Sequence, residues 1–241
     1  MIVRKTPEQV DQMAVAGDIL VRCLKMLESK TRAGVTTAEL DAAAEKFIRS
    51  QGAVPSFKGY RGFPGSICAS PNSMVVHGIP DDYECKRGDV LSIDIGVTYE
   101  GWVADAAVTV PIGPISTEAK NLLEVTRNSL FVGIEQMVPG NHLGDVSHAI
   151  QSSVESNGLS VIRTLVGHGI GREMHEEPQV PNFGEAGRGP VSPPWSSTRR
   201  PRNSSARRAP CPRSRAIGAS RDRSAPRPTR WSSMASPGLT S

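Results

Sequence analysis

The spacing of apolar residues predicts two amphipathic helices at the start of the chain. The first begins where Thr6 can cap a helix, with Pro7 at the first helical position and Gln9 at the third. Its apolar positions recur at helical spacing: Val10, Met13, Leu20, Leu24 and Leu27. The second begins at a capping box formed by Thr36 and Glu39, and Gly52 ends it.

An alternating pattern follows and predicts a β-hairpin. Residues 53–80 are rich in Gly, Pro and aromatic residues, which indicates short strands and structured loops. Residues 90–97 alternate between apolar residues and polar or small ones, which is typical of a half-buried strand. A turn at residues 99–101 returns the chain into a second strand over residues 102–110.

The next stretch predicts two more helices and one more strand. Ser116 begins a third helix, which residues 139–140 (Pro-Gly) end. Its apolar positions are Leu122, Leu123, Leu130, Ile134 and Met137. A fourth helix is expected over residues 143–157 and a strand over residues 161–166, leading into Gly-His-Gly-Ile-Gly at 167–171. Helices and antiparallel hairpins in this order predict an α+β domain with helices against one sheet.

Composition divides the chain near residue 186. Residues 186–241 hold 12 Arg, no Lys, no Glu and 9 of the 19 Pro, without periodicity. Such a segment cannot bury enough apolar surface to offset its ordering entropy. We therefore predict a folded domain over residues 1–185 and a disordered Arg/Ser/Pro-rich tail over residues 186–241.

Charge and cysteine content exclude several classes of protein. The net charge of +4 is the sum of +11 in residues 186–241 and −7 in residues 1–185, so the basic pI does not indicate a nucleic-acid-binding domain. The four cysteines form no C-x-x-C pair, which disfavours a structural zinc site or a disulfide framework. No signal peptide and no run of 18 apolar residues is found, so we expect a cytoplasmic protein with no membrane association.

Two aspartates are the most informative candidates for chemistry. Asp94 and Asp105 lie on the two arms of the predicted hairpin, symmetric about its turn, so we expect them to face each other across the strands. Two carboxylates that close repel unless a cation lies between them or one is protonated. Either one alone fits an exposed residue on a solvated strand. The symmetry and the apolar neighbours favour a clamp for metal ions.

Three histidines lie in loops bounded by Gly or Pro. His168 stands between glycines at a predicted strand end, and an imidazole beside carboxylates suits Zn, Fe, Mn or Co. His175 projects from the next segment, and His77 precedes a turn. For each, a loop histidine without a special role is the alternative. His142 and His148 lie on or near a predicted helix and are expected at the surface.

Five motifs in order resemble those of type I methionine aminopeptidases, which share the pita-bread fold with prolidases and creatinase. They are Tyr-Arg-Gly-Phe-Pro at 60–64, residues 68–80 (Cys-Ala-Ser-Pro-Asn through His-Gly-Ile-Pro), Ser-Ile-Asp-Ile-Gly at 92–96, Ala-Asp at 104–105, and Gly-His-Gly-Ile-Gly at 167–171 with residues 175–182. The large N-terminal domain of prolidases is absent, which favours the simple bacterial form. The resemblance implies a pita-bread (creatinase/aminopeptidase-like) α+β fold, incomplete at the C-terminus.

The resemblance also implies roles for individual residues. Asp94 would chelate one metal ion, Asp105 would bridge two and His168 would bind the other; the ions would be Co, Mn, Fe or Zn. The remaining site residues would contact the substrate. His77 and His175 would act at the scissile amide, and the methionine side chain would lie against Tyr60, Phe63 and Cys68. Met174 stands where the family often has an aromatic residue, so one pocket wall differs.

The activity implied is removal of the initiator methionine from nascent proteins. The partners would be nascent peptide N-termini near the ribosome, and the protein would be a monomer. A non-catalytic pita-bread homologue that binds peptide or nucleic acid is the alternative, although the persistence of all five Asp and His residues argues against it. Nonspecific binding of nucleic acid through the Arg-rich tail is a further possibility.

One departure from the family bears on activity. The family completes its site with two glutamates farther along, and this chain has no Glu after Glu185. We interpret the abrupt change in composition as a shift of reading frame in GC-rich DNA. Coding DNA without a frame that encodes Thr-x-Glu-Pro downstream of Asn182 would contradict this interpretation. With three of five ligands, little or no activity is expected of this chain.

Overall fold

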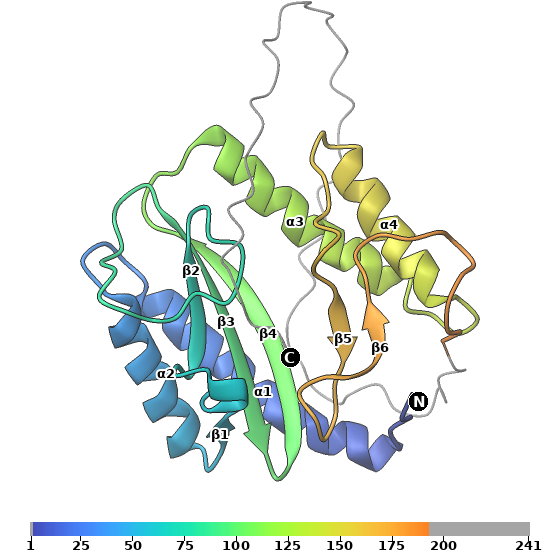
Figure 1. Cartoon of the computed structure of the whole chain (residues 1–241), viewed down its shortest axis with the longest axis horizontal. Coiled ribbons are helices and arrows are strands. Elements are labelled where there is room, and N and C mark those ends of the chain that lie inside the picture. The colour runs from blue at the N-terminus through green and yellow to red at the C-terminus, as the bar shows by residue number, and fades with distance from the viewer. Residues whose placement is uncertain (1, 193–241) are drawn as a thin grey trace, which may run out of the picture. The chain divides into compact units, whose positions relative to one another are not determined.

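Capped helices and one long central strand define the first half of the molecule. The computed structural model describes residues 2–192, so the predicted disorder of residues 193–241 lies outside the described residues (Figure 1). The helices are α1 (Pro7–Lys30), α2 (Thr37–Ser50), α3 (Thr117–Glu135) and α4 (Leu143–Glu155), with a 3₁₀ turn, η1, at Tyr60–Gly62. The strands are β1 (Val54–Pro55), β2 (Ile67–Pro71), β3 (Val90–Tyr99), β4 (Trp102–Pro111), β5 (Gly167–Gly169) and β6 (Glu176–Val180).

Both predicted helix starts are confirmed. The Thr6 hydroxyl accepts a hydrogen bond from the Gln9 backbone, and the Gln9 side chain accepts one from the Thr6 backbone. Thr36 and Glu39 form the same reciprocal box at α2. These contacts satisfy backbone N–H groups that a helix start otherwise leaves unpaired.

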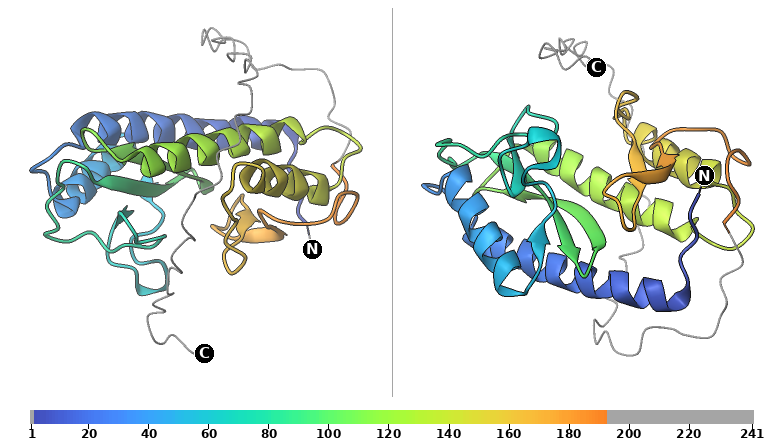
Figure 2. Two further views of the ribbon diagram at one scale, coloured as in Figure 1. Left: turned by 90° about the horizontal axis from the view of Figure 1, so that it is seen from above. Right: turned by 60° about the horizontal axis from the view of Figure 1, so that its bottom comes forward.

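The two helices cover one face of a four-stranded antiparallel sheet (Figure 2). β3 is central and pairs with β4 on one side and with β1 and β2 on the other. The alternate residues of β3 that face the helices are fully buried: Leu91, Ile93, Ile95 and Val97. They pack against the buried residues of α1 and α2. Because side chains alternate along a strand, Asp94 must lie on the opposite face.

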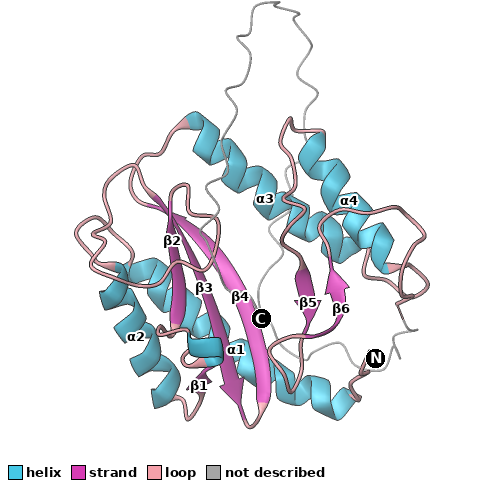
Figure 3. Ribbon diagram, in the orientation of Figure 1, coloured by secondary structure: helices cyan, strands magenta, loops and turns pink. Residues whose placement is uncertain are grey.

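The hairpin register differs from the predicted one. Tyr99 pairs with Trp102 around a two-residue turn, Glu100–Gly101, in which both residues have positive φ (49° and 76°) (Figure 3). A turn of this kind matches the twist of the strands it joins. Its centre lies one residue later than predicted, so Asp94 pairs with Ala107 and Asp105 with Gly96. The two aspartates are diagonal neighbours on one face and not directly opposite each other.

The second half consists of α3, α4 and the two-stranded antiparallel sheet of β5 and β6. The strand predicted over residues 161–166 is wrong: this segment is irregular, it pairs with no strand within residues 2–192, and β5 begins at Gly167. Residues 187–191 are hydrogen-bonded to α4; for example, the Gly187 N–H donates to Asp145 Oδ1 at 2.8 Å. The boundary at residue 185 stays a prediction.

Helix α3 is present as predicted, but its predicted apolar positions do not form its buried face. Leu122, Leu130, Ile134 and Met137 are 49–63% exposed. The helix instead packs on α4 through small residues, and a side chain at Gly133 would meet Ile150 of α4 at 2.7 Å. These exposed side chains, together with that of Phe131, are here called the apolar band of α3, and nothing within residues 2–192 buries them. None of the helices described there is both long and apolar enough to cross a membrane.

Candidate metal centre and substrate pocket

Two carboxylates and one imidazole meet on the sheet face that is turned away from α1 and α2. Asp94 comes from β3, Asp105 from β4 and His168 from β5. His168 Nε2 lies 3.4 Å from Asp105 Oδ2, and both side chains are about one-fifth exposed. The carboxylates of Asp94 and Asp105 are close enough for each to affect the pKa of the other. These three side chains, separated by up to 74 positions in the chain, were each predicted from sequence as metal ligands.

Hydrogen bonding of His168 directs one ring nitrogen to the carboxylates. Nδ1 lies 2.9 Å from the Gly169 carbonyl oxygen. A carbonyl oxygen only accepts, so Nδ1 carries a proton and Nε2 is the ring nitrogen that faces Asp105. This second contact fixes the tautomer, as a backbone carbonyl commonly does for metal-binding histidines.

The charges of the two aspartates are unfavourable without a cation. Burial, followed by the negative charge of Asp105, raises the pKa of Asp94 to about 7. Burial also raises the pKa of Asp105, although His168 opposes this effect. Asp105 Oδ1 is buried and has no hydrogen-bond partner within the described residues. A buried carboxylate oxygen without a partner is costly, and a cation there would remove that cost.

The donors fit divalent ions but are not a complete cage. Carboxylate oxygens and a neutral imidazole are the ligands that Zn, Mn, Fe and Co accept. Within residues 2–192, no three His, Cys, Asp or Glu side chains are grouped so that they alone could hold an ion. Asp94, Asp105 and His168 therefore form one wall of a centre.

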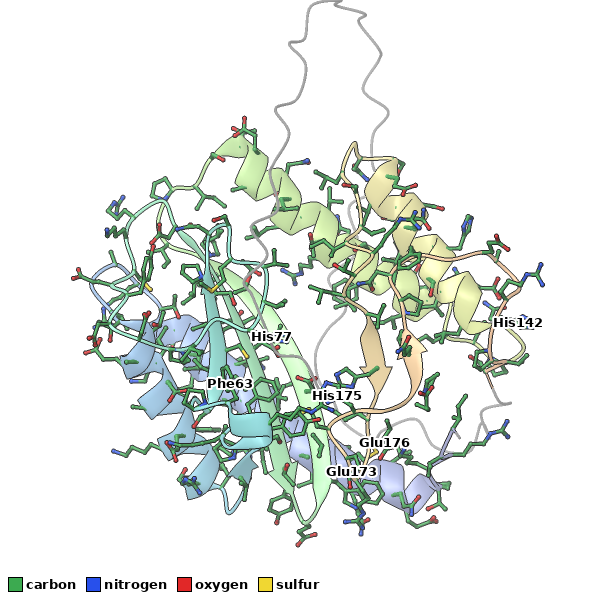
Figure 4. The ribbon with its side chains drawn as sticks, in the orientation of Figure 1. Phe63, His77, His142, Glu173, His175 and Glu176 are labelled. Carbon is green, nitrogen blue, oxygen red and sulfur yellow. The ribbon has the colours of Figure 1, made fainter. Side chains whose placement is uncertain are left out.

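A cavity of about 520 Å³ opens onto this wall. Asp94, His77, His168 and His175 all line it, together with apolar residues of the segment 165–166. Figure 4 shows His175 between β4 and the β5–β6 hairpin. His77 contributes from the loop after β2, where its φ of 61° is unusual for a residue other than glycine. Four of the five predicted Asp and His residues thus share one cavity, and Asp105 is not among its lining residues.

Three rings, those of His168, His175 and Tyr60, lie in a row beside the aspartates. The His175 ring centroid lies 4.2 Å from that of His168 and 5.5 Å from that of Tyr60. The Tyr60 hydroxyl lies 2.9 Å from His175 Nδ1. Burial, followed by the neighbouring His168, lowers the pKa of His175, so its ring is neutral near pH 7. If Tyr60 donates to Nδ1, the Nε2 proton of His175 is available to a ligand.

An apolar cluster lies next to the carboxylates on the same side of the sheet. Its buried members are Phe57, Cys68, Val103 and Met174, and Tyr60, Phe63 and Ile170 pack against them. Cys68 pairs with Asp94 across β2 and β3. Burial raises the pKa of the Cys68 thiol to about 12, so it serves as an apolar wall and not as a nucleophile.

Sequence reasoning missed part of this cluster. Phe57 was not singled out, although an aromatic residue in a Gly/Pro-rich segment was a usable signal. Its ring meets Phe63 edge-on, with centroids 6.5 Å apart. Gly96 makes the cluster possible, because a Cβ there would lie 2.7 Å from Met174 and 2.8 Å from Phe57.

Comparison with known proteins agrees with this site. The model of metallopeptidase family M24 matches residues 11–198. Methionine aminopeptidase from Clostridium perfringens is 53% identical over 190 residues, which are 79% of this chain and 76% of that protein. Methionine aminopeptidase 1 from Bacillus subtilis is 48% identical, covering 79% and 77%. The crystal structure of methionine aminopeptidase from Thermotoga maritima superposes with a TM-score of 0.78 at 41% identity, covering 80% of this chain and 78% of that one.

The fold is the pita-bread fold, and together with the paired carboxylates it defines a metal-dependent hydrolase. The chain belongs to metallopeptidase family M24, among the methionine aminopeptidases. Enzymes of this family use a dinuclear centre of divalent ions. The resemblance predicted from five motifs is confirmed, and so is the predicted fold class.

Proposed function

We propose that this chain binds peptides that begin with methionine at the cavity described above, and that its chemistry is metal-dependent removal of that methionine. The main observation in support is the arrangement of the cavity. Asp94, Asp105 and His168 lie beside the apolar cluster of Phe57, Cys68, Val103 and Met174, and His77 and His175 line the cavity that Asp94 and His168 also line. An apolar pocket next to convergent polar groups is the usual form of a substrate site.

Each group has a distinct task in this proposal. Asp94, Asp105 and His168 would hold the metal ions, which when bound would supply an activated water and polarise the amide carbonyl. The apolar cluster of Phe57, Phe63, Cys68 and Met174 excludes water around the methionine side chain. Met in place of an aromatic residue gives this wall more freedom to adapt.

The histidines act on the peptide itself. His175, neutral and oriented by Tyr60, donates from Nε2 to the carbonyl or nitrogen of the scissile amide. Hydrogen bonds aimed at developing charge stabilise a transition state more than the ground state. His77 approaches from the opposite loop and binds the same backbone. We further propose that the substrates are nascent chains near the ribosome and that the protein acts as a cytoplasmic monomer.

A binding experiment tests substrate choice separately from turnover. The chain loaded with Mn²⁺ is titrated with Met-Ala-Ser and with Leu-Ala-Ser in a calorimeter. We expect the methionine peptide to bind at least about tenfold more tightly, because an unbranched side chain packs against the apolar cluster better than a branched one does. Equal affinities would contradict the proposal. Binding without any release of free methionine would favour the alternative of a non-catalytic homologue.

We propose that turnover by this chain is low because its ligand set is incomplete. Asp94, Asp105 and His168 do not by themselves form an ion-binding group within residues 2–192, and the family's two further glutamates have no counterpart after Glu185. Titration with Mn²⁺ or Co²⁺ should give weak binding that Asp105→Asn abolishes. Tight binding of two ions per chain, with rapid release of methionine from Met-Ala-Ser, would overturn this proposal.

A further inference from the structure

The loop that carries Met174 and His175 is held in place by the N-terminal segment. Residues 171–176, here called the His175 loop, connect β5 to β6, whose first residue is Glu176, and pass close to the start of α1 (Figure 4). Met174 is buried in the apolar cluster and His175 lines the cavity. The position of this loop therefore determines both a pocket wall and a substrate-facing imidazole.

The Glu176 side chain is hydrogen-bonded to the backbone of the His175 loop. Its Oε1 accepts hydrogen bonds from the Arg172 N–H at 2.8 Å and the Glu173 N–H at 3.2 Å. Its Oε2 forms an ion pair with Lys5 Nζ, and both side chains are only 13–14% exposed. One carboxylate thus joins the two ends of the loop to a residue 171 positions earlier.

The backbone is shaped to admit the lysine. A Cβ on Gly171 would lie 2.5 Å from Lys5 Cε and 2.4 Å from Glu176 Oε1, so only glycine leaves room for the pair. Lys5 Nζ also donates to the Val3 carbonyl at 3.1 Å, which fixes the extended segment before the helix. The lysine is not among the residues that line the cavity.

A second set of contacts ties the other side of the loop to the β3–β4 hairpin. The Arg172 guanidinium lies 3.9 Å above the Trp102 ring and donates to the Glu100 carbonyl at 2.9 Å. The Val103 N–H donates to the Gly171 carbonyl at 2.9 Å. The β3–β4 hairpin therefore fixes one side of the His175 loop, and the Lys5–Glu176 ion pair fixes the other side.

We propose that Lys5 is a positioning residue: through Glu176 it fixes the His175 loop, and so sets the place of His175 and Met174 in the substrate site. The pair is mostly shielded from water, where a charge-assisted hydrogen bond is stronger than at an exposed surface. Without it, Glu176 loses its ionic partner and the loop gains freedom. The effect on the loop is independent of the proposed function, whereas the effect on catalysis depends on it.

Amide hydrogen exchange tests the effect on the loop. We compare the wild type with Lys5→Met, which keeps the length and removes the charge, and with Lys5→Arg, which keeps the charge. The amides of Arg172 and Glu173 should exchange about tenfold faster in Lys5→Met and return to within about threefold of the wild type in Lys5→Arg. Exchange at Ile93 and Ile95 in β3 should not change.

Lys58→Met is the matched control, because it breaks another Lys–Glu pair, Lys58–Glu45 at 2.5 Å, away from the loop. It should leave exchange in the His175 loop unchanged. Unchanged loop exchange in Lys5→Met would overturn the proposal, and so would equal acceleration in Lys58→Met or acceleration at Ile93. The double variant Lys5→Met/Glu176→Gln should accelerate exchange by less than the sum of the two single-variant effects. Each single substitution already removes the same Lys5–Glu176 ion pair.

A kinetic measurement tests the consequence for the site. With whatever turnover of Met-Ala-Ser the Mn²⁺-loaded chain supports, Lys5→Met should lower kcat about fivefold or more with a smaller change in KM, and Lys5→Arg should restore it. Faster loop exchange without any change in kcat would overturn the positioning role. If the wild type has no turnover, the proposed activity is contradicted. The exchange experiment still tests whether Lys5 fixes the His175 loop.

Discussion

At the scale of single residues, Asp89 shows how a carboxylate fixes the start of the central strand. Its Oδ2 accepts from the Tyr83 hydroxyl and the Lys86 N–H, both at 2.8 Å, and Oδ1 accepts from Asn72 at 3.0 Å. Burial alone would raise the pKa of Asp89, but these hydrogen bonds outweigh it and lower the pKa below its ordinary value. The residue stands directly before β3, so the network positions the strand that carries Asp94.

The lowered pKa of Asp89 predicts a pH-dependent contribution to stability. A depressed acid contributes stability above its unfolded pKa, about 3.9, and loses it as pH falls through the folded value. Asp89→Asn should therefore lower the free energy of unfolding by roughly 1–2 kcal/mol at pH 7, and by less below about pH 4. Urea unfolding at several pH values measures this, with exposed Asp82→Asn as the control. A cost that stays constant from pH 7 to pH 3 would contradict the prediction.

Gly96 is the second residue for which we make a prediction. A methyl group there would overlap Met174 and Phe57, so Gly96→Ala should destabilise the chain by about 1–3 kcal/mol and weaken binding of methionine peptides.

Gly17 in α1 is the opposite case, because its Cβ would meet nothing within 4 Å. Gly17→Ala should stabilise the chain by about 0.5–1 kcal/mol. Thermal unfolding and peptide titration separate the two, and tolerance of Ala at residue 96 would show that the cluster is loose.

At the scale of elements, the sequence predicted the helix starts, which depend on neighbouring residues, better than the strands, which depend on pairing with distant ones. The starts of α1 and α2 follow from side chains three residues apart, and both capping boxes formed as expected. The hairpin was also predictable, but its register depends on which two residues adopt left-handed backbone. Glu rarely adopts the left-handed conformation that Glu100 has here. The presence of Glu at residue 100 therefore did not indicate that the turn is centred between residues 100 and 101. The strand predicted over 161–166 failed because a strand also needs a partner.

The turn itself offers a test. Asn favours the left-handed conformation that Glu100 adopts, and Asn-Gly is the preferred pair for a two-residue hairpin. Glu100→Asn should therefore raise the free energy of unfolding by about 0.5–1 kcal/mol. The Arg172 bond to the residue 100 carbonyl is retained, because it involves only the backbone. A β-branched substitution, Glu100→Val, serves as the control and should destabilise; urea unfolding that ranks the two in the reverse order would contradict this reading.

At the scale of the whole molecule, the site is assembled from residues that spacing alone could not bring together. The motifs identified Asp94, Asp105 and His168 one by one, and the two aspartates reach each other through a diagonal pair. The bond between Tyr60 and His175 joins residues 115 positions apart, and Lys5 and Glu176 are 171 apart. Such contacts depend on how two halves of the fold pack, which no local pattern encodes.

The apolar band of α3 is the whole-molecule feature with the clearest physical consequence. Leu130, Phe131, Ile134 and Met137 are each at least half exposed, and nothing within residues 2–192 covers them. Exposed apolar patches of this kind promote association. We predict that the chain, proposed above to act as a monomer, self-associates only as its concentration rises, and that the double variant Leu130→Arg/Ile134→Arg remains monomeric in sedimentation experiments. Because both side chains are already exposed, the variant should unfold at nearly the same urea concentration as the wild type. A wild type that stays monomeric and binds no apolar dye would show that the band is covered, by residues outside 2–192 or by a change in α3.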